Sequence, residues 1–242
     1  MKNLLLIQPG PFGDIFVCAP IAKWYADRGY KVHWPITKKF ESTLEKFDYV
    51  TPIILSDEVL HSDWLRSDVM KILPTVGNYD KVINLADRGP HPTAQKPNEN
   101  FEICKYRLAD VPFNEKNNLV WTRNLQKEDS LVHQLKLKKP YAVIHTVDSL
   151  GQKAEVPQIN INTIEVSEIE GYAIQDWYKV FLGASEIYCV ESAVHQFMDG
   201  VVHKLTKEKY LLKRPAVPEG CRFTVSSNWN LKFIGKDTII RA

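Results

Sequence analysis

The sequence contains little cysteine, and none of it is spaced for a metal or redox centre. The four cysteines, Cys18, Cys104, Cys189 and Cys221, lie far apart. The absence of a CxxC motif excludes the usual zinc-ligand and thioredoxin-like patterns. Cys18 and Cys189 lie in apolar runs, which predicts buried free thiols. Free thiols persist in a reducing compartment, so we expect a cytoplasmic protein.

Long apolar runs and a charge excess are also missing. The apolar run that begins at Leu4 stops at Gln8, which is too short for the apolar region of a signal peptide. No stretch approaches the length of a membrane span, so no transmembrane segment is expected. The net charge is only +2, which excludes a global basic field of the kind that drives nonspecific DNA binding. A local basic groove stays open, and a nucleic-acid acceptor is possible but unsupported by the charge.

A dinucleotide-binding fingerprint is the third absence. No GxGxxG motif follows the first expected strand, and no clear ribose-binding acid follows the second. Both are features of NAD-dependent and epimerase-type enzymes. Their absence argues against a doubly wound enzyme of that kind.

The composition that remains is that of a globular α/β protein. Hydrophobic residues make up 44% of the 242 residues and charged residues 25%, which is ordinary for a folded domain. Apolar periodicity predicts strands that alternate with helices, which implies parallel pairing with right-handed crossovers. The predicted strands cover residues 4–7, 30–35, 49–55, 81–86, 141–145, 160–166, 186–190 and 210–212. The predicted helices cover residues 14–27, 40–47, 64–73, 101–108, 126–137, 174–182 and 192–202. The tail from Phe223 onward is ambiguous.

The same strand, turn and helix pattern begins near residue 4 and again near residue 141. Each half then has about 120 residues, which is near the usual domain size. We therefore predict an α/β fold of two small Rossmann-like parallel-sheet domains that face a central cleft. The N-terminal domain would cover residues 1–122 and the C-terminal domain residues 123–242. The proline-rich stretch 89–100 is expected to be a long loop, and such loops are often functional.

The first strand ends in a turn that carries Gly10, Pro11, Phe12, Gly13 and Asp14. Glycine in such a turn permits unusual backbone angles and a close approach of substrate, although a plain strand-to-helix turn explains it equally well. Asp14 is expected at the N-terminus of the following helix. An N-cap carboxylate suits that place, and it would also face a ligand at the carboxyl end of the strand. Its roles as cap and as base are compatible.

The second half holds two further motifs. The strand 141–145 ends at His145, and a polar segment follows from Thr146 to Lys153. The strand 186–190 runs into the segment Glu191-Ser192-Ala193-Val194-His195, which opens a helix. A helix N-terminus favours phosphate through its backbone N–H groups and its dipole.

These motifs together resemble the GT-B glycosyltransferases, specifically the heptosyltransferase-like enzymes of glycosyltransferase family 9. Those enzymes begin with a buried strand and a glycine-containing turn that ends in Gly-Asp, as Gly13-Asp14 does here. Their late motif is an acidic residue, Ser or Thr, a small residue and a His two positions later, and Glu191 to His195 matches it. The family usually has Asp where this chain has Glu191 and Gly where it has Ala193. The chain is also shorter than typical members.

The resemblance implies a transfer of sugar from a nucleotide-diphosphate donor to an acceptor hydroxyl, with inversion at the anomeric carbon. Asp14 would be the base that activates the acceptor. The residues implied on the acceptor side are Gly10, Pro11, Phe12, Gly13, Asp87 and Arg88. The residues implied at the donor are His145, Thr146, Lys153, Glu191, Ser192, Ala193 and His195. No metal site is implied by the visible ligands, no cofactor is required, and Mg2+ is an optional addition.

Simpler explanations compete with several of these assignments. His195 can be a packed, hydrogen-bonded core histidine. Lys153 alone is more typical of a solvated surface lysine, and the same caution applies to Arg88. As a whole, the chain can also be a catalytically inactive GT-B-like module that binds a nucleotide or a partner. The sequence does not identify the donor base, the sugar or the acceptor, which is expected to be a saccharide or another hydroxyl compound.

Overall fold

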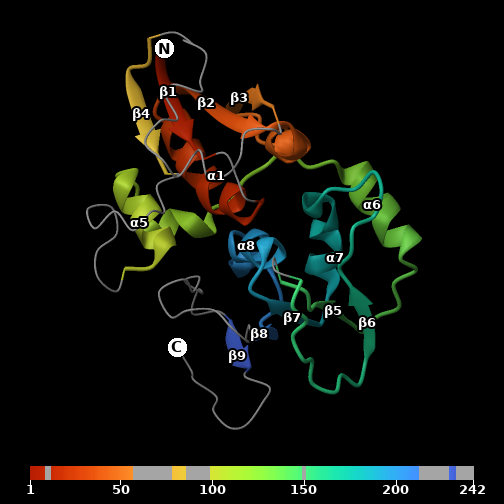
Figure 1. The fold of residues 1–242 in the computed structure, drawn as a ribbon. Helices are drawn as coiled ribbons and strands as arrows, with labels where there is room; N and C mark the ends of the chain where they lie inside the picture. Colours follow the sequence, from red (N-terminus) through yellow and green to blue (C-terminus); the bar gives the residue numbers. More distant parts are fainter. Residues whose placement is uncertain (9–11, 57–77, 86–98, 149–150, 213–228, 233–242) are drawn as a thin grey trace. The chain divides into compact units, whose positions relative to one another are not determined.

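The chain forms two compact units, and the division between them falls after Thr122. The structure is a computed structural model, and it describes residues 1–8, 12–56, 78–85, 99–148, 151–212 and 229–232 (Figure 1). A cleft between the units stays a prediction.

The first unit is built on a four-stranded parallel sheet with the strand order β3-β2-β1-β4. Its strands are β1 (Lys2–Ile7), β2 (Tyr30–Thr37), β3 (Val50–Leu55) and β4 (Lys81–Asn84). The chain moves from β1 outward to β3 and then returns to the other side of β1. The boundary between β1 and β4 is therefore a topological switch point, and open α/β sheets bind ligands at the carboxyl ends of strands at such points.

Helices pack on this sheet through an apolar core. They are α1 (Phe12–Ala26), α2 (Glu41–Leu44) and α5 (Phe101–Leu108), with the 3-10 turns η1 (Lys38–Phe40) and η2 (Phe113–Asn117). The whole central stretch of α1 is buried, as is the apolar run of β1. Two tyrosine hydroxyls donate to backbone carbonyls across the packed helices: Tyr106 to Val17 at 2.9 Å and Tyr25 to Ala109 at 2.6 Å. These bonds fix α5 and the turn after it against α1.

The second unit is built on a five-stranded parallel sheet with the order β6-β5-β7-β8-β9. Its strands are β5 (Tyr141–His145), β6 (Asn162–Glu165), β7 (Glu186–Val190), β8 (Lys209–Leu212) and β9 (Asn230–Lys232). The chain moves from β5 to β6 on one side and returns to β7 on the other. The switch point of this sheet therefore lies between β5 and β7.

The helices of the second unit are short. They are α6 (Leu125–Gln134), α7 (Tyr178–Gly183) and α8 (Ala193–Asp199), with the 3-10 turns η3 (Ile174–Trp177) and η4 (Val202–Lys204). Helices α6 and α7 lie side by side (Figure 1). Arg123 reaches the buried Glu128 of α6 through two bonds of 2.8 and 2.6 Å, and its guanidinium lies over the Tyr178 ring of α7. A bidentate pair of this kind fixes both distance and orientation.

All eight predicted strands are present, and β9 is an addition from the ambiguous tail. The predicted helices 40–47 and 174–182 each form as a 3-10 turn that continues into a short α-helix, η1 into α2 and η3 into α7. The predicted helix 192–202 forms as the short helix α8, which the 3-10 turn η4 follows. In the last of them α8 stops at Asp199, because Gly200 forms the C-cap. The predicted helix 64–73 lies outside the described residues. Cys18 and Cys189 are buried free thiols, as predicted.

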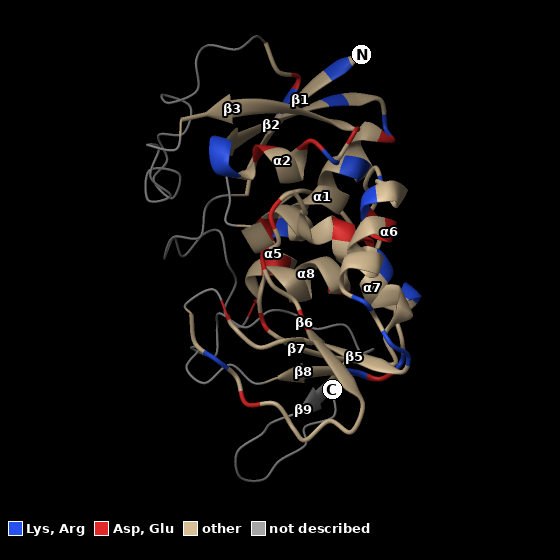
Figure 2. Ribbon diagram, turned by 90° about the vertical axis from the view of Figure 1, so that its right-hand side faces the viewer, with Lys and Arg blue, Asp and Glu red and all other residues tan. Residues whose placement is uncertain are grey.

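Charged residues of both signs are interspersed along the ribbon of each unit (Figure 2). This matches the small net charge of +2. Among the described helices, none combines the length and the apolar character needed to cross a bilayer.

Candidate functional site

The carboxyl end of β1 carries a buried carboxylate, Asp14. Helix α1 begins at Phe12, so Asp14 lies in the first turn and is not the N-cap that the sequence suggested. Its side chain is only 2% exposed. The Nε2 of Gln8, the residue directly after β1, donates to Asp14 Oδ2 at 3.2 Å. The strand end and the helix start therefore hold this carboxylate together.

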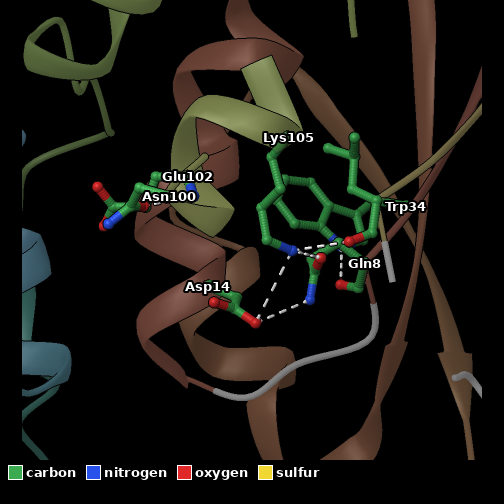
Figure 3. A network of polar contacts seen from close by, with 7 residues as sticks. Gln8, Asp14, Trp34, Asn100, Glu102 and Lys105 are labelled. Atoms are coloured by element: carbon green, nitrogen blue, oxygen red, sulfur yellow. Dashed lines mark hydrogen bonds and ion pairs between the residues drawn. The ribbon is translucent and has the colours of Figure 1, made fainter. Parts of the chain in front are cut away.

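A buried lysine of α5 completes the group (Figure 3). Lys105 Nζ lies 3.9 Å from Asp14 Oδ2, donates to Gln8 Oε1 and donates to the Leu85 carbonyl at 2.7 Å. Leu85 directly follows β4, so the ammonium lies where the neighbouring strands β1 and β4 end. The Trp34 indole N–H of β2 donates to the Gln8 carbonyl at 2.6 Å. The switch point of the first sheet is thus filled by a connected polar network.

The residue pattern of α5 indicates buried charges of the kind that form this network. The buried face of α5 includes Glu102, Lys105 and Tyr106, at helical spacing. Two of these three positions are charged, and a charge on a buried face requires a partner. Glu102 has one in Lys116, at 2.8 Å. A predicted helix with acidic and basic residues on its inward stripe therefore indicates buried ion pairs, although it does not name the partners.

The other acceptor-side residues are only partly described. Phe12 packs its ring against Phe16 and Phe40, at centroid distances of 5.5 and 5.7 Å. Gly13 lies inside the first turn of α1 and not in the preceding turn, a shift that is within the usual uncertainty of helix boundaries. The remaining predictions, Gly10, Pro11, Asp87 and Arg88, lie outside the described residues.

The carboxyl edge of the second sheet brings two of the predicted donor residues together. His145 ends β5, and Ser192 follows β7 as the N-cap of α8. Their side chains meet across the switch point, with His145 Nδ1 and Ser192 Oγ 3.2 Å apart. Ser192 Oγ also accepts from the His195 backbone N–H at 3.3 Å. The contact places an imidazole and a hydroxyl where open α/β sheets bind ligands.

After β5, the described residues 146–148 and 151–154 pair as the two arms of a small hairpin. Val147 pairs with Lys153, and the Ala154 N–H donates to the Thr146 carbonyl at 2.8 Å. Thr146 is buried and its hydroxyl donates to Glu165, at the end of β6, at 2.9 Å. Lys153 is exposed. The hairpin therefore presents a lysine to solvent after β5, while Thr146 joins the neighbouring strand end.

The structure separates His195 from the predicted donor residues at this edge. Its ring is fully buried and packs edge-on against Trp229, at a centroid distance of 5.0 Å. This arrangement favours the packed core histidine over a diphosphate contact. Glu191 and Ala193 are half-buried on either side of Ser192. Within the described ranges, no cluster of three or more His, Cys, Asp or Glu side chains is arranged to hold a metal ion.

The pH dependence of stability should report on His145. Burial lowers the pKa of its imidazole, and the Glu165 charge opposes this in part. The folded state thus favours the neutral ring, so the stability it contributes is present above the ordinary imidazole pKa and is lost as the pH falls through the folded value. We expect His145→Gln to lose less thermal stability than the wild type between about pH 7 and pH 5. Thermal unfolding across that range measures the difference.

Wild type and His145→Gln share every other titrating group, so the difference between their pH-dependent stabilities reports on His145. His33 also has a lowered pKa, through burial and the Lys31 charge, but it is present in both proteins. Parallel melting curves for wild type and His145→Gln across the range would show that the imidazole does not titrate with folding.

Known structures share this fold, although no profile of a known protein family and no curated protein matches the sequence. The structure is similar to a glycosyl transferase family 9 protein from Veillonella parvula, with a TM-score of 0.60 and 9% identity over 98% of this chain and 88% of that one. It is similar to ADP-heptose LPS heptosyltransferase II of E. coli, with a TM-score of 0.56 and 11% identity over 96% and 90%. It is also similar to the E. coli heptosyltransferase WaaC with ADP, with a TM-score of 0.53 and 13% identity over 97% and 91%.

These similarities cover nearly the whole chain and include both parallel sheets. The resemblance that the motifs predicted is therefore confirmed at the level of the fold. At identities of 9–13% the comparison establishes architecture and not activity. The chain has the two-unit α/β fold of the GT-B heptosyltransferases.

Proposed function

We propose that this protein is a glycosyltransferase that moves a sugar from a nucleotide-diphosphate donor to an acceptor hydroxyl. The observation that carries the proposal is the position of Asp14. A buried carboxylate lies in a polar network at the switch point of the first sheet, in a chain with the fold of sugar-transferring enzymes. The cleft expected between the two units is part of this proposal.

In the proposed reaction Asp14 is the general base. The acceptor hydroxyl gives its proton to the carboxylate, its oxygen bonds to the anomeric carbon, and the bond from that carbon to the diphosphate breaks. A single displacement of this kind inverts the anomeric centre. A positioned base of this type contributes about 10²–10⁴-fold to a rate.

In the same proposal the second unit binds the donor. His145 and Ser192 meet at the switch point of its sheet, and Lys153 is exposed in the hairpin that follows β5. An ammonium there would neutralise part of the diphosphate charge as it departs. The proposal needs no metal ion, so transfer in the presence of EDTA is expected, and a requirement for Mg2+ would contradict that part of it.

A second candidate function is a GT-B-like module that binds a nucleotide without turnover. The burial of Asp14 favours it, because a base that is 2% exposed and paired with Lys105 must become accessible before it can meet an acceptor. Nucleotide binding without donor consumption would support the module. Turnover of a nucleotide sugar would exclude it.

Calorimetry against a panel of nucleoside diphosphates tests the donor site. We expect one of them to bind, and Lys153→Ala to weaken that binding several-fold, because the exposed ammonium would contact the diphosphate. The effect should shrink at high salt. Lys138→Ala is the matched control, since Lys138 is equally an exposed lysine but precedes the amino end of β5. If both variants weaken nucleoside diphosphate binding equally, or if neither weakens it, Lys153 is not part of the donor site.

A further inference from the structure

The buried ammonium of Lys105 is unusual for its place in the fold. It is 3% exposed on α5, and a charge taken out of water is stable only with partners close by. Its partners come from three separate segments: the residue after β1, the residue after β4 and the first turn of α1. These are the segments that meet at the switch point of the first sheet.

Lys105 determines which way the Gln8 amide faces. An amide has an accepting oxygen at one end and a donating nitrogen at the other. Because Lys105 Nζ donates to Gln8 Oε1, the Gln8 Nε2 is turned toward Asp14, whose Oδ2 accepts from it at 3.2 Å. The Trp34 indole holds the Gln8 backbone from the other side. Lys105 thus acts on the carboxylate twice, through Gln8 and through its own charge at 3.9 Å.

From this geometry we propose that Lys105 is a positioning residue for the proposed base, Asp14: it orients the carboxylate through Gln8 and places its own ammonium 3.9 Å from Asp14 Oδ2. The inference rests on the proposed function for its catalytic meaning. It concerns a residue of α5 that touches neither sugar nor nucleotide in the proposed reaction. Figure 3 shows the Lys105, Gln8 and Asp14 side chains converging.

A purely structural role for Lys105 would be to attach α5 to the sheet. Helix α5 also has a second buried ion pair that holds it against η2, Glu102 with Lys116 at 2.8 Å, with side chains 0% and 4% exposed. The Lys116 ammonium donates to Glu102 Oε2. The two lysines are therefore comparable in burial and differ in the carboxylate that they pair with, so one is a control for the other.

The charge has a predictable effect on protonation. Burial disfavours a carboxylate, and an ammonium within hydrogen-bonding range of the same network favours it. Among the described residues of the elements packed against α1, the other buried charges are Glu102 and Lys116, which pair with each other. Removal of the Lys105 charge leaves the desolvation of Asp14 uncompensated. The carboxylate then accepts a proton at a higher pH, and a base that is already protonated cannot accept the acceptor's proton.

The experiment compares Lys105→Met with Lys116→Met and Lys105→Arg. For Lys105→Met we expect kcat to fall at least tenfold with KM little changed, and the acid limb of the pH–rate profile to rise by about one unit. Lys116→Met should lose stability but keep the wild-type acid limb. Lys105→Arg, which keeps the charge, should recover part of kcat. An acid limb that moves equally in both Met variants, or in neither, overturns the inference.

Gln8→Glu serves if Lys105→Met does not fold. It is isosteric and turns a second carboxylate toward Asp14, so it should raise the acid limb as well. NMR titration of the Asp14 carboxyl, assigned by its loss in Asp14→Asn, separates this inference from the proposed function. If the wild type transfers no sugar, the proposed function fails. An Asp14 titration midpoint that is the same in Lys105→Met or Gln8→Glu as in the wild type would overturn the inference about Lys105, whatever the transfer assay shows.

Discussion

Asp14→Asn should abolish most of the turnover of a nucleotide sugar while the protein stays folded. The amide keeps the size and much of the hydrogen bonding of the carboxylate, including an oxygen that can accept from Gln8 Nε2. It cannot accept the acceptor's proton. Loss of a general base costs about 10²–10⁴-fold in rate. Steady-state kinetics on a purified variant, with circular dichroism and thermal unfolding as folding checks, measure the loss.

Asp27→Asn is the matched control for this experiment. Asp27 follows the other end of α1, and its exposed side chain pairs with Lys23. We expect wild-type turnover from it, because an exposed ion pair contributes little to stability and this one lies away from the switch point. Near-normal turnover in Asp14→Asn would remove Asp14 from the mechanism, whatever the control does.

Lys116→Met should cause a large loss of stability. It leaves the Glu102 charge buried at 0% exposure, without the ammonium that lies 2.8 Å away. Removal of one partner of a buried pair costs about 3–5 kcal/mol, whereas replacement of both by apolar residues is often close to neutral. We therefore expect the double variant Glu102→Leu with Lys116→Met to recover most of the loss. Urea unfolding gives both free energies.

Lys179→Met removes one partner of an exposed ion pair, and it serves as the surface counterpart of the buried pair of Glu102 and Lys116. Lys179 pairs with Asp129, and the two side chains are 48% and 59% exposed. A loss of less than about 1 kcal/mol is expected, because water solvates the remaining charge. A loss from Lys116→Met as small as that from Lys179→Met would show that the Glu102 carboxylate is solvated or protonated in the folded protein.

The sheets were predictable because local pattern determines them. The apolar run of β1 and the strand 141–145 have the continuous hydrophobic character of strands covered on both faces, and both form where predicted. The helix at Phe101–Leu108 also forms with the predicted bounds. Parallel pairing was predicted from the alternation of strands and helices, whereas the strand order was not, because the chain passes from β3 at one edge of the sheet to β4 at the other. Strand β9 was missed because a three-residue strand in an ambiguous tail carries almost no periodic signal.

The polar network at the first switch point was not predictable in the same way. Gln8 and Lys105 are separated by 97 positions in the chain. No periodicity reports a contact of that range, because only the packing of α5 on the sheet creates it. The misassigned capping role of Asp14 had a local cause, since the helix begins two residues earlier than expected.

The residues of the predicted donor motif face different surroundings in the folded chain. The segment Glu191 to His195 matched a family pattern as a unit, yet the folded chain divides it. Ser192 faces His145 at the strand ends, whereas His195 faces the core and Trp229. Two residues of one short motif can point to different surroundings, because a helix turns by about 100° for each residue.

The location of a bound nucleoside diphosphate tests the central claim most directly. A crystal structure of the protein soaked with the diphosphate that binds in calorimetry would show it. The account predicts density for the diphosphate beside His145 and Ser192, where β5 and β7 end. Density beside Gln8 and Asp14, where β1 ends, would contradict it and would reverse the assignment of donor and acceptor units.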